Sequence, residues 1–489
     1  MRSRTSSRAG GPPTRSRPEG RAAPQGGEIL RAPRSARPAG RGRRIACLLL
    51  AAAALGCGPA ERRGEGDASP GGRAAPRGRV SGRVVVIGID GADWRVIDPL
   101  IGRGLAPAFA RLRREGATGI LGSMEPSASP SLWTTVATGV GPERHGIRGF
   151  VVPAAGRAGP RVRPVTSAMR RAPPFWKILS HYGRSVGVVG WLVSWPAEPV
   201  NGYVVSSYLP YIYNWSTGRP LKGTIVEGIP RQTFPEELIG ELEPLKIRPT
   251  DLDEATLRRF YDPARLARLP AGDRACVEGF RWSLASDETY RRIALKLFEE
   301  RPVDLLAVYF GGVDVASHRF WKFAYPEDLD YDVTAEEQAV LGRVIDEYYI
   351  HVDRLVGEYL DRLRPQDTLV VLSDHGFRPV LTPGRPTISG HHRPEGILAL
   401  HGGRVYRGNR IRHARLVDVL PTLLVLLEVP IAMELEGHVL GDALDPWFAV
   451  DHPPRFVDAY VVEGADGEPE EADVERNVLE RLRSLGYIR

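Results

Sequence analysis

The sequence predicts an α/β fold: a mainly parallel central sheet with helices on both faces and an inserted cap region. Continuous apolar runs at 83–90, 185–191, 303–312 and 367–373 are typical of strands buried on both faces. Helical patterns separate several of these runs. Strand–helix–strand units at this spacing place successive strands parallel in one sheet.

Two of the connecting helices have recognisable ends. The segment 174–183 is predicted to be helical and to stop at Gly183. A longer helix is predicted from about 334 to 364, where Thr334 and Glu337 have the spacing of a capping box. Behind them, apolar side chains recur on one helical face: Leu341, Val344, Ile345, Tyr348, Val352, Leu355, Tyr359 and Leu363.

The remaining segments define the domain organisation. Residues about 200–285 are rich in Pro, Tyr and charge and interrupt the strand–helix rhythm, so we expect them to form an insertion or cap over one end of the sheet. The main domain is expected to span 83–447. A C-terminal tail at 448–489 contains an amphipathic helical pattern at 474–488, to which we assign no chemistry.

The basic charge of the chain is confined to its N-terminal part. Residues 1–80 contain 17 Lys and Arg against 5 Asp and Glu, a net charge of +12, whereas the whole chain carries +7. The remaining 409 residues contain 49 against 54, a net charge of −5. Because the folded part is slightly acidic, we expect no nucleic acid as a partner.

The N-terminal part is predicted to direct export. Residues 1–57 end in the apolar run IACLLLAAAALGC, the pattern of a signal peptide and too short for a membrane span. Its ALGC ending resembles a lipoprotein-processing box, which would make Cys57 a lipidated membrane anchor; ordinary cleavage near the same place is the alternative. Residues 58–82 are expected to be a flexible linker. We therefore expect a periplasmic protein or a membrane-anchored lipoprotein.

The cysteine content fits export without disulfides. Cys47 and Cys57 lie in the signal, which leaves Cys276 alone in the main domain. We therefore expect no intrachain disulfide and no zinc site made of thiolates.

Asp and His residues follow three of the predicted strands. Asp90 ends the first strand, Asp314 and His318 follow the third, and Asp374 and His375 stand together after the last. The carboxyl ends of parallel strands converge on one edge of a sheet, where ligands bind. Asp and His without Cys suit zinc or a similar divalent ion in a catalytic site.

Two further histidines, His391 and His392, lie downstream in SGHHRPEG. Each candidate taken alone has a simpler explanation, because an Asp after a strand often caps a turn and a surface His is often solvated. The joint pattern, with Asp or Asp and His after each of these three strands, favours the metal site.

The start of a predicted helix in EPSASPSLWTTVATG carries a candidate nucleophile. Ser129 precedes Pro130, and Ser at the N-cap with Pro at N1 is a common helix start. The same geometry can serve chemistry. A hydroxyl on a metal loses its proton easily, and the N–H groups of the first helical turn attract a phosphate.

Five ordered motifs together resemble the type I phosphodiesterase/nucleotide pyrophosphatase branch of the alkaline phosphatase superfamily. They are VIGIDGADW, PSASPSLWTTVATG with PERHGI, GGVDVASHRFW, LSDHGF and SGHHRPEGI, and the likeness spans about 83–445. The resemblance implies an alkaline-phosphatase-like fold. It also implies a hydrolase that uses two zinc ions and a covalent phospho-Thr or phospho-Ser intermediate.

The resemblance implies two sets of ligands for these two divalent ions. The first set would be Asp314, His318 and His392. The second would be Asp90, Asp374 and His375, together with the oxygen of the nucleophile Ser129. His392 is preferred to His391 because the final family motif reads G-x-H, which Gly390 and His392 satisfy.

The position of the nucleophile follows from the resemblance as well. Alignment back from Thr138 and Gly139 selects Ser129, with Ser127 and Ser131 as the alternatives.

The chain departs from the pattern of nucleotide pyrophosphatases at two places. Those enzymes carry Thr as the nucleophile, where this chain has Ser129. Leu132 stands where nucleotide pyrophosphatases carry an Asn that contacts phosphate, which weakens specificity for nucleotide diesters. A sulfatase is excluded because the C/S-x-P-x-R motif is missing around Ser129. Arg144 and His145 either reach the phosphate or are structural, and Trp191 and Trp195 are expected to pack rather than to face a substrate.

These observations predict a metal-dependent hydrolase of phosphoric esters that acts on a small phosphoester outside the cytoplasmic membrane. The preference for monoesters or diesters stays open, as does the oligomeric state. A phosphotransferase or mutase that uses the same phosphoserine is one alternative. The other is a non-catalytic binding lipoprotein, which the complete set of ligand candidates argues against.

Overall fold

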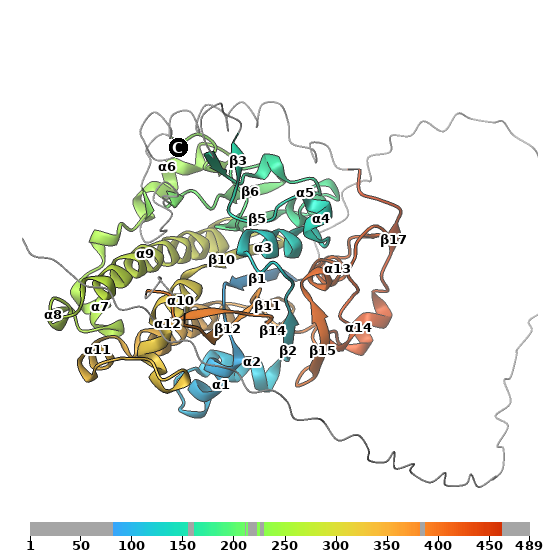
Figure 1. Cartoon of the computed structure of the whole chain (residues 1–489). Helices are drawn as coiled ribbons and strands as arrows, with labels where there is room; N and C mark the ends of the chain where they lie inside the picture. The colour runs from blue at the N-terminus through green and yellow to red at the C-terminus, as the bar shows by residue number, and fades with distance from the viewer. Residues whose placement is uncertain are drawn as a thin grey trace, which may run out of the picture. The chain divides into compact units, whose positions relative to one another are not determined.

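A nine-stranded mixed sheet runs through the centre of the computed structural model (Figure 1), in the order β15-β2-β14-β11-β1-β10-β5-β6-β9. Its middle strands are mutually parallel: β11 (Thr368–Leu372), β1 (Val84–Ile89), β10 (Leu305–Phe310), β5 (Val186–Val189) and β6 (Gly202–Val205). The four predicted strands are confirmed as β1, β5, β10 and β11, each shorter than its apolar run by one or two residues at each end.

The outer strands complete the sheet with antiparallel as well as parallel pairs. β14 pairs antiparallel with β11 and β2, β15 pairs parallel with β2, and β9 pairs antiparallel with β6. These strands are β14 (Glu395–Gly402), β2 (Ala117–Gly122), β15 (Arg410–Arg415) and β9 (Thr233–Phe234).

Helices cover both faces of the sheet, and each face has its own apolar core. Successive residues of β1 point to opposite faces, so Val85 and Ile87 join one core while Val84 and Val86 join the other. The first core is built with α1 (Trp94–Gly102), α2 (Pro107–Glu115), α9 (Ala271–Glu300), α10 (Gly312–Ala324) and α12 (Val344–Leu360). The second is built with α3 (Ser129–Thr138), α5 (Phe175–His181) and α13 (Leu416–Leu426). The predicted fold class is confirmed.

The smaller elements frame the sheet. They are α4 (Pro142–His145), the pair β3 (Val151–Ala154) and β4 (Arg161–Pro164), the hairpin β12 (Gly376–Pro379) and β13 (Gly390–Arg393), the pair β16 (Ile431–Ala432) and β17 (Phe456–Val457), and α14 (Pro446–Asp451). The structure describes residues 82–154, 161–210, 212–213, 223–224, 229–381 and 387–461. The predicted signal, the linker and the 474–488 helix lie outside these residues and stay predictions. None of the described helices combines the length and the apolar character of a membrane span.

The helix predicted from about 334 to 364 is two helices. α11 (Ala335–Leu341) has Gly342 as its C-cap, and α12 begins at Val344. A Cβ at Gly342 would lie 3.0 Å from the carbonyl oxygen of Phe323 in α10, so close packing requires glycine at this position. Glycine also has weak helix propensity, which accounts for the break.

Both ends of the 200–285 segment belong to the main fold, which corrects the prediction that the whole segment is an insertion or cap. β6 and β9 lie in the sheet, and α9 packs into the first core through Phe280, Leu284 and Ile293. The prediction relied on composition. The many charged residues of the segment made the apolar face of α9 difficult to recognise in the sequence. Between these ends lie β7 (Ile212–Tyr213), β8 (Gly223–Thr224), α6 (Leu238–Leu242), α7 (Glu254–Phe260) and α8 (Pro263–Leu266). Their role as a cap over a substrate stays a prediction.

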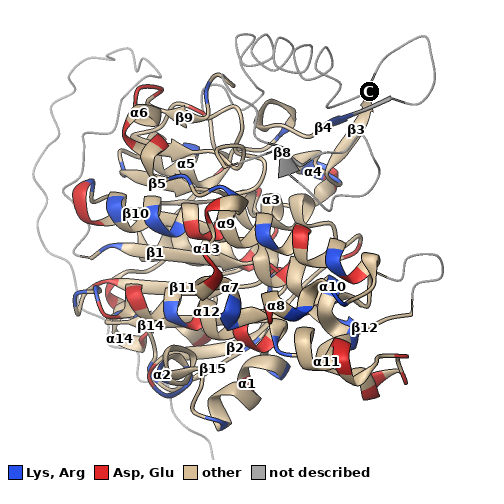
Figure 2. Cartoon of the chain, turned by 90° about the vertical axis from the view of Figure 1, so that its left-hand side faces the viewer, with Lys and Arg blue, Asp and Glu red and all other residues tan. Residues whose placement is uncertain are grey.

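Charges of both signs are interspersed on the helices of the first face (Figure 2). Arg291 of α9, for example, pairs with Glu288 on its own helix and with Glu358 of α12. Cys276, also in α9, is buried and free.

The capping box of α11 yields a stability prediction. Thr334 Oγ1 accepts a hydrogen bond from Glu337 N at 3.2 Å, and Glu337 Oε2 accepts one from Thr334 N at 2.7 Å. We expect Thr334→Ala to lower the free energy of unfolding by about 1 kcal/mol, because an N–H at the helix start loses its acceptor. Denaturant unfolding measures this, and an unchanged free energy would contradict the capping assignment.

Candidate active site

Three adjacent strands bring the predicted acidic residues to one edge of the sheet. β1 lies between β11 and β10 and runs parallel to both. Asp90 follows β1 directly, Asp374 follows β11, and Asp314 lies in the first turn of α10, just after β10. Because all three strands end at the same edge, residues almost three hundred positions apart in sequence become neighbours.

The hairpin β12–β13 adds His392 to this edge. β12 begins directly after His375, and Phe377 of β12 pairs with His392 of β13. The imidazole rings of His375 and His392 consequently stack, with centroids 3.6 Å apart and planes inclined by 19°. His391, the neighbour of His392, is exposed to solvent.

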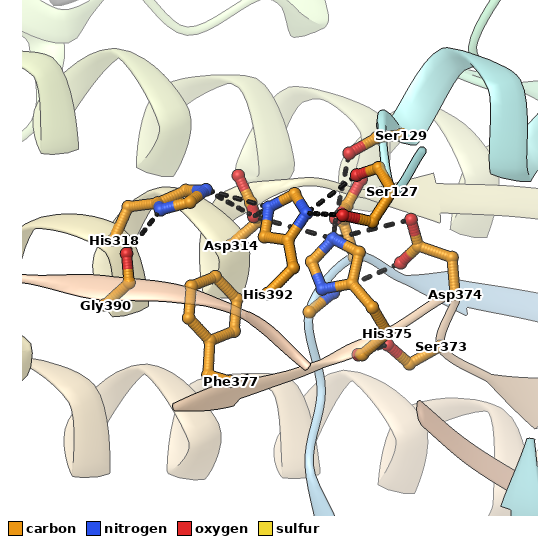
Figure 3. A network of polar contacts seen from close by, with 12 residues as sticks. Ser127, Ser129, Asp314, His318, Ser373, Asp374, His375, Phe377, Gly390 and His392 are labelled. Carbon is orange, nitrogen blue, oxygen red and sulfur yellow. Dashed lines mark hydrogen bonds and ion pairs between the residues drawn. The ribbon is translucent and has the colours of Figure 1, made fainter. Parts of the chain in front are cut away.

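The three predicted histidine ligands are oriented in the same way (Figure 3). In each ring, Nδ1 faces a backbone carbonyl oxygen: Gly390 O at 2.8 Å from His318, Gly376 O at 3.2 Å from His375, and Ser127 O at 2.7 Å from His392. A carbonyl only accepts, so Nδ1 carries the proton and donates it. Nε2 then carries the free lone pair of the neutral ring, as in histidines that ligate metals.

The Nε2 atoms of His318 and His392 converge on Asp314. Each lies 3.3 Å from Asp314 Oδ1, and the two nitrogens are 2.9 Å apart. Two lone pairs facing each other at this distance repel unless a cation lies between or beside them. Asp314, His375 and His392 also place one potential ligand atom each within 4.8 Å of one another.

A second group shares His375 with the first. Its Nε2 lies 3.2 Å from Asp90 Oδ1, 3.6 Å from Asp374 Oδ2 and 3.8 Å from Asp314 Oδ1. Asp90, Asp374 and His375 again bring one potential ligand atom each within 4.8 Å of one another. All six predicted ligands therefore lie together, and His375 stands between the two groups.

Ser129 lies at the start of α3, next to Asp90. Its Oγ is 3.4 Å from Asp90 Oδ1, and only 4% of the residue is exposed. The N-cap is Ala128 and Ser129 is the first residue of the helix, so the N-cap role considered for Ser129 belongs to the residue before it. The hydroxyl is thereby released from capping and contacts the Asp90 carboxylate instead.

The two alternative serines occupy different surroundings. Ser127 lies beside His392, with its Oγ 3.3 Å from Nδ1 of that ring. Ser131 is buried in α3, and its Oγ meets no hydrogen-bond partner among the described residues. Of the three serines, Ser129 alone has a hydrogen bond to one of the six predicted ligands through its hydroxyl as donor.

The electrostatics of this cluster call for a cation. Burial, with the neighbouring Asp90 and Asp314 carboxylates, raises the pKa of Asp374 well above its usual value. Burial alone would also raise the pKa of Asp314, but His318 and His392, when they are protonated, outweigh burial and hold that pKa well below its usual value. Within the described part of the chain, only histidines form ion pairs with Asp90, Asp314 and Asp374.

Three buried atoms of the cluster lack a hydrogen-bond partner among the described residues: Asp314 Oδ1, Asp374 Oδ2 and His375 Nε2. Leaving buried polar atoms without partners costs about 1–3 kcal/mol each. Donor atoms of Asp and His that converge in this way fit divalent metal ions.

Two residues that hold Asp90 were not predicted from the sequence. Trp133 Nε1 and Tyr309 OH both donate hydrogen bonds to Asp90 Oδ2, at 3.0 and 2.7 Å. Trp133 lies one helical turn after Ser129 and could have been found by that spacing. Nothing in the sequence distinguishes Tyr309 from the other residues of its strand.

The other residues considered from the sequence are structural in their contacts. Leu132 is fully buried in the second core. Arg144 pairs with Glu434 at the surface, and His145 is buried against the Thr135 hydroxyl. Trp191 packs edge-on against Trp133, and Trp195 stacks on Tyr208, in line with the packing expected for them.

Comparison with solved structures finds phosphoester and phosphonate enzymes. Human ectonucleotide pyrophosphatase/phosphodiesterase 5 has a TM-score of 0.43 and 12% identity, over 76% of this chain and 99% of that one. The murine enzyme in complex with AMP has a TM-score of 0.43 and 11% identity, over 76% and 100%. Phosphonoacetate hydrolase from Sinorhizobium meliloti has a TM-score of 0.34 and 19% identity, over 62% of this chain and 58% of that one. The chain thus spans little more than half the length of this last protein.

Among curated proteins, no sequence matches the chain. The family model for type I phosphodiesterase/nucleotide pyrophosphatase matches residues 84–410, about two thirds of the chain and all the predicted site residues. The chain therefore belongs to the type I phosphodiesterase/nucleotide pyrophosphatase family.

Proposed function

We propose that this protein is a two-metal phosphoric ester hydrolase that works through a covalent phosphoserine on Ser129. The observation that supports this most is the place of the Ser129 hydroxyl, 3.4 Å from the carboxylate of Asp90 and beside a cluster of Asp and His residues. A nucleophile at this position needs a neighbouring positive charge to lose its proton, and the cluster is suited to bind cations.

Two divalent ions, with zinc expected from the nitrogen and oxygen donors, would occupy the two groups of the cluster. Asp90, Asp374 and His375 would hold one ion near Ser129, and Asp314, His318 and His392 would hold the other. When bound, the two ions would lower the pKa of the nucleophile and stabilise charge on the phosphoryl and leaving-group oxygens.

The residues of the chain perform the remaining tasks. Ser129 Oγ attacks phosphorus, forming the Oγ–P bond while the bond from phosphorus to the leaving oxygen breaks. Water then attacks the phosphoserine, which releases phosphate or a phosphomonoester and restores the hydroxyl. The N-terminus of α3, where Ser129 lies, attracts the negative phosphoryl group through its helix dipole.

The nucleophile is tested by Ser129→Ala. With zinc present, we expect turnover of p-nitrophenyl phosphate or bis-p-nitrophenyl phosphate to fall at least ~100-fold, on the scale of losing an essential nucleophile. Mass spectrometry of the acid-quenched wild type should find phosphate on Ser129.

Ser131→Ala is the matched control, because Ser131 lies on the same helix. We expect this variant to keep the wild-type turnover. Retained activity in Ser129→Ala would move the nucleophile elsewhere, with Ser127→Ala as the next variant. Faster transfer to an added alcohol than to water would contradict a hydrolase and indicate a phosphotransferase.

The metal site is tested by zinc-dependent stability. We expect free zinc at a hundred times its Kd to raise the free energy of unfolding by about 2.7 kcal/mol, because the metal binds the folded state only. His392→Ala should remove most of this gain. Thermal unfolding with and without a chelator measures it.

His391→Ala is the matched control, since the neighbouring ring is exposed and outside both groups. We expect it to keep the full zinc effect. Equal zinc stabilisation of the two variants would contradict the proposed ligands.

We also propose that the protein is exported and held at the membrane by lipidated Cys57, on the basis of the ALGC motif in the sequence. Cys57→Ser should move the protein from the membrane fraction to the soluble fraction of cells. An unchanged distribution would contradict lipidation at this residue.

A further inference from the structure

We infer that Tyr309 and Trp133 are positioning residues, which orient the Asp90 carboxylate so that it can bind a metal ion beside Ser129. This inference deepens the proposed function and rests on it, since it assumes that Asp90 is a ligand. Neither residue is among the six predicted ligands, and in the described structure neither side chain is hydrogen-bonded to Ser129. Their action on the site runs through Asp90.

The two oxygens of Asp90 have separate sets of partners. Oδ2 accepts hydrogen bonds from Tyr309 OH at 2.7 Å and from Trp133 Nε1 at 3.0 Å. Oδ1 lies 3.4 Å from Ser129 Oγ and 3.2 Å from His375 Nε2. Two donors on one oxygen therefore turn the other oxygen toward the nucleophile and the shared histidine.

The two donors come from different elements, and both side chains pack into the second core. Tyr309 belongs to β10 and is paired with Gly88 of β1, two residues before Asp90. Trp133 reaches the same carboxylate from α3 and meets the Tyr309 ring edge-on, with centroids 5.2 Å apart. The contacts thus tie the nucleophile helix to the strands that carry two of the acidic ligands.

The position of the Trp133 ring depends on the absence of a side chain at Gly88. A Cβ there would lie 2.6 Å from Trp133 Cζ3 and 2.7 Å from Cη2, closer than real contacts allow. The ring is fully buried and also packs edge-on against Trp191, with centroids 5.1 Å apart. A rigid aromatic group is therefore held with its one polar atom on Asp90.

Asp90 differs in this respect from the other two acidic residues. Asp374 is held by a single long hydrogen bond, from Gly91 N to Oδ1 at 3.4 Å, and its Oδ2 meets no donor among the described residues. Oδ1 of Asp314 likewise meets no donor there. A carboxylate that donors already hold in one orientation loses less rotational freedom when it binds an ion, which strengthens binding. Trp133 and Tyr309 thus orient a metal ligand in addition to packing in the core.

Tyr309→Phe tests this, because it removes only the hydroxyl. We expect zinc binding at the site of Asp90 to weaken about 10-fold or more, the usual scale for losing a partner of a metal ligand. Competition with a chromophoric chelator measures the Kd. The absorption spectrum of the cobalt(II)-loaded protein should also change, since the ligand field depends on how Asp90 is oriented.

Tyr359→Phe is the matched control, since Tyr359 is fully buried and its hydroxyl has no hydrogen-bond partner in the described structure. It should leave the zinc Kd and the cobalt spectrum unchanged. Asp90→Asn sets the scale for losing the ligand itself. Trp133→Phe is the second variant, and it should weaken zinc binding in the same direction.

The outcomes test the ligand role of Asp90 separately from the positioning role of Tyr309 and Trp133. Unchanged zinc binding in Asp90→Asn would overturn the ligand role and with it the proposed function. If Asp90→Asn weakens binding while Tyr309→Phe and Trp133→Phe both keep the wild-type Kd and cobalt spectrum, only the positioning role is overturned. Should Tyr309→Phe fail to fold, the Kd of Trp133→Phe decides.

Discussion

The mutual repulsion of three neighbouring carboxylates is the constraint on which the site depends. Asp90 and Asp374 are buried, and Asp314 lies within reach of both through His375. Like charges cannot be buried together without compensation, because the low dielectric of the interior strengthens their repulsion. The histidines supply lone pairs rather than permanent charge, so cations are the natural compensation.

The fold meets this constraint by placing the acidic residues on rigid, adjacent elements. β11, β1 and β10 are neighbours, and each delivers one carboxylate at its end. The loop before α3 connects the nucleophile to one of the ligands. Ser127, two residues before Ser129, accepts a hydrogen bond from His392 through its carbonyl oxygen and so orients that ring. Nucleophile and ligand are thus held by one short segment, which explains how a site assembled from distant parts of the chain can keep a defined geometry.

Much of this arrangement could be predicted from the sequence, for identifiable reasons. Strands buried on both faces are continuous apolar runs, and a polar residue that ends such a run has few structural alternatives, so Asp90 and Asp374 stand out. The order of the motifs then added the family. Sequence periodicity was less informative where close packing decided the outcome. Gly342 separates two helices although the apolar stripe in the sequence continues across it. One face of α9 packs into the core although the sequence around it is rich in charged residues. Tyr309 and the stacking of His375 on His392 depend on which strands become neighbours, which no local pattern encodes.

The central claim is that six Asp and His side chains hold two divalent ions beside Ser129. Anomalous X-ray diffraction at the zinc edge, on crystals of protein purified with zinc, tests it most directly. The account predicts two peaks, one on each side of His375, each about 2.0–2.2 Å from its ligand nitrogens and oxygens. Peaks elsewhere, or side chains that coordinate no metal beside Ser129, would contradict it.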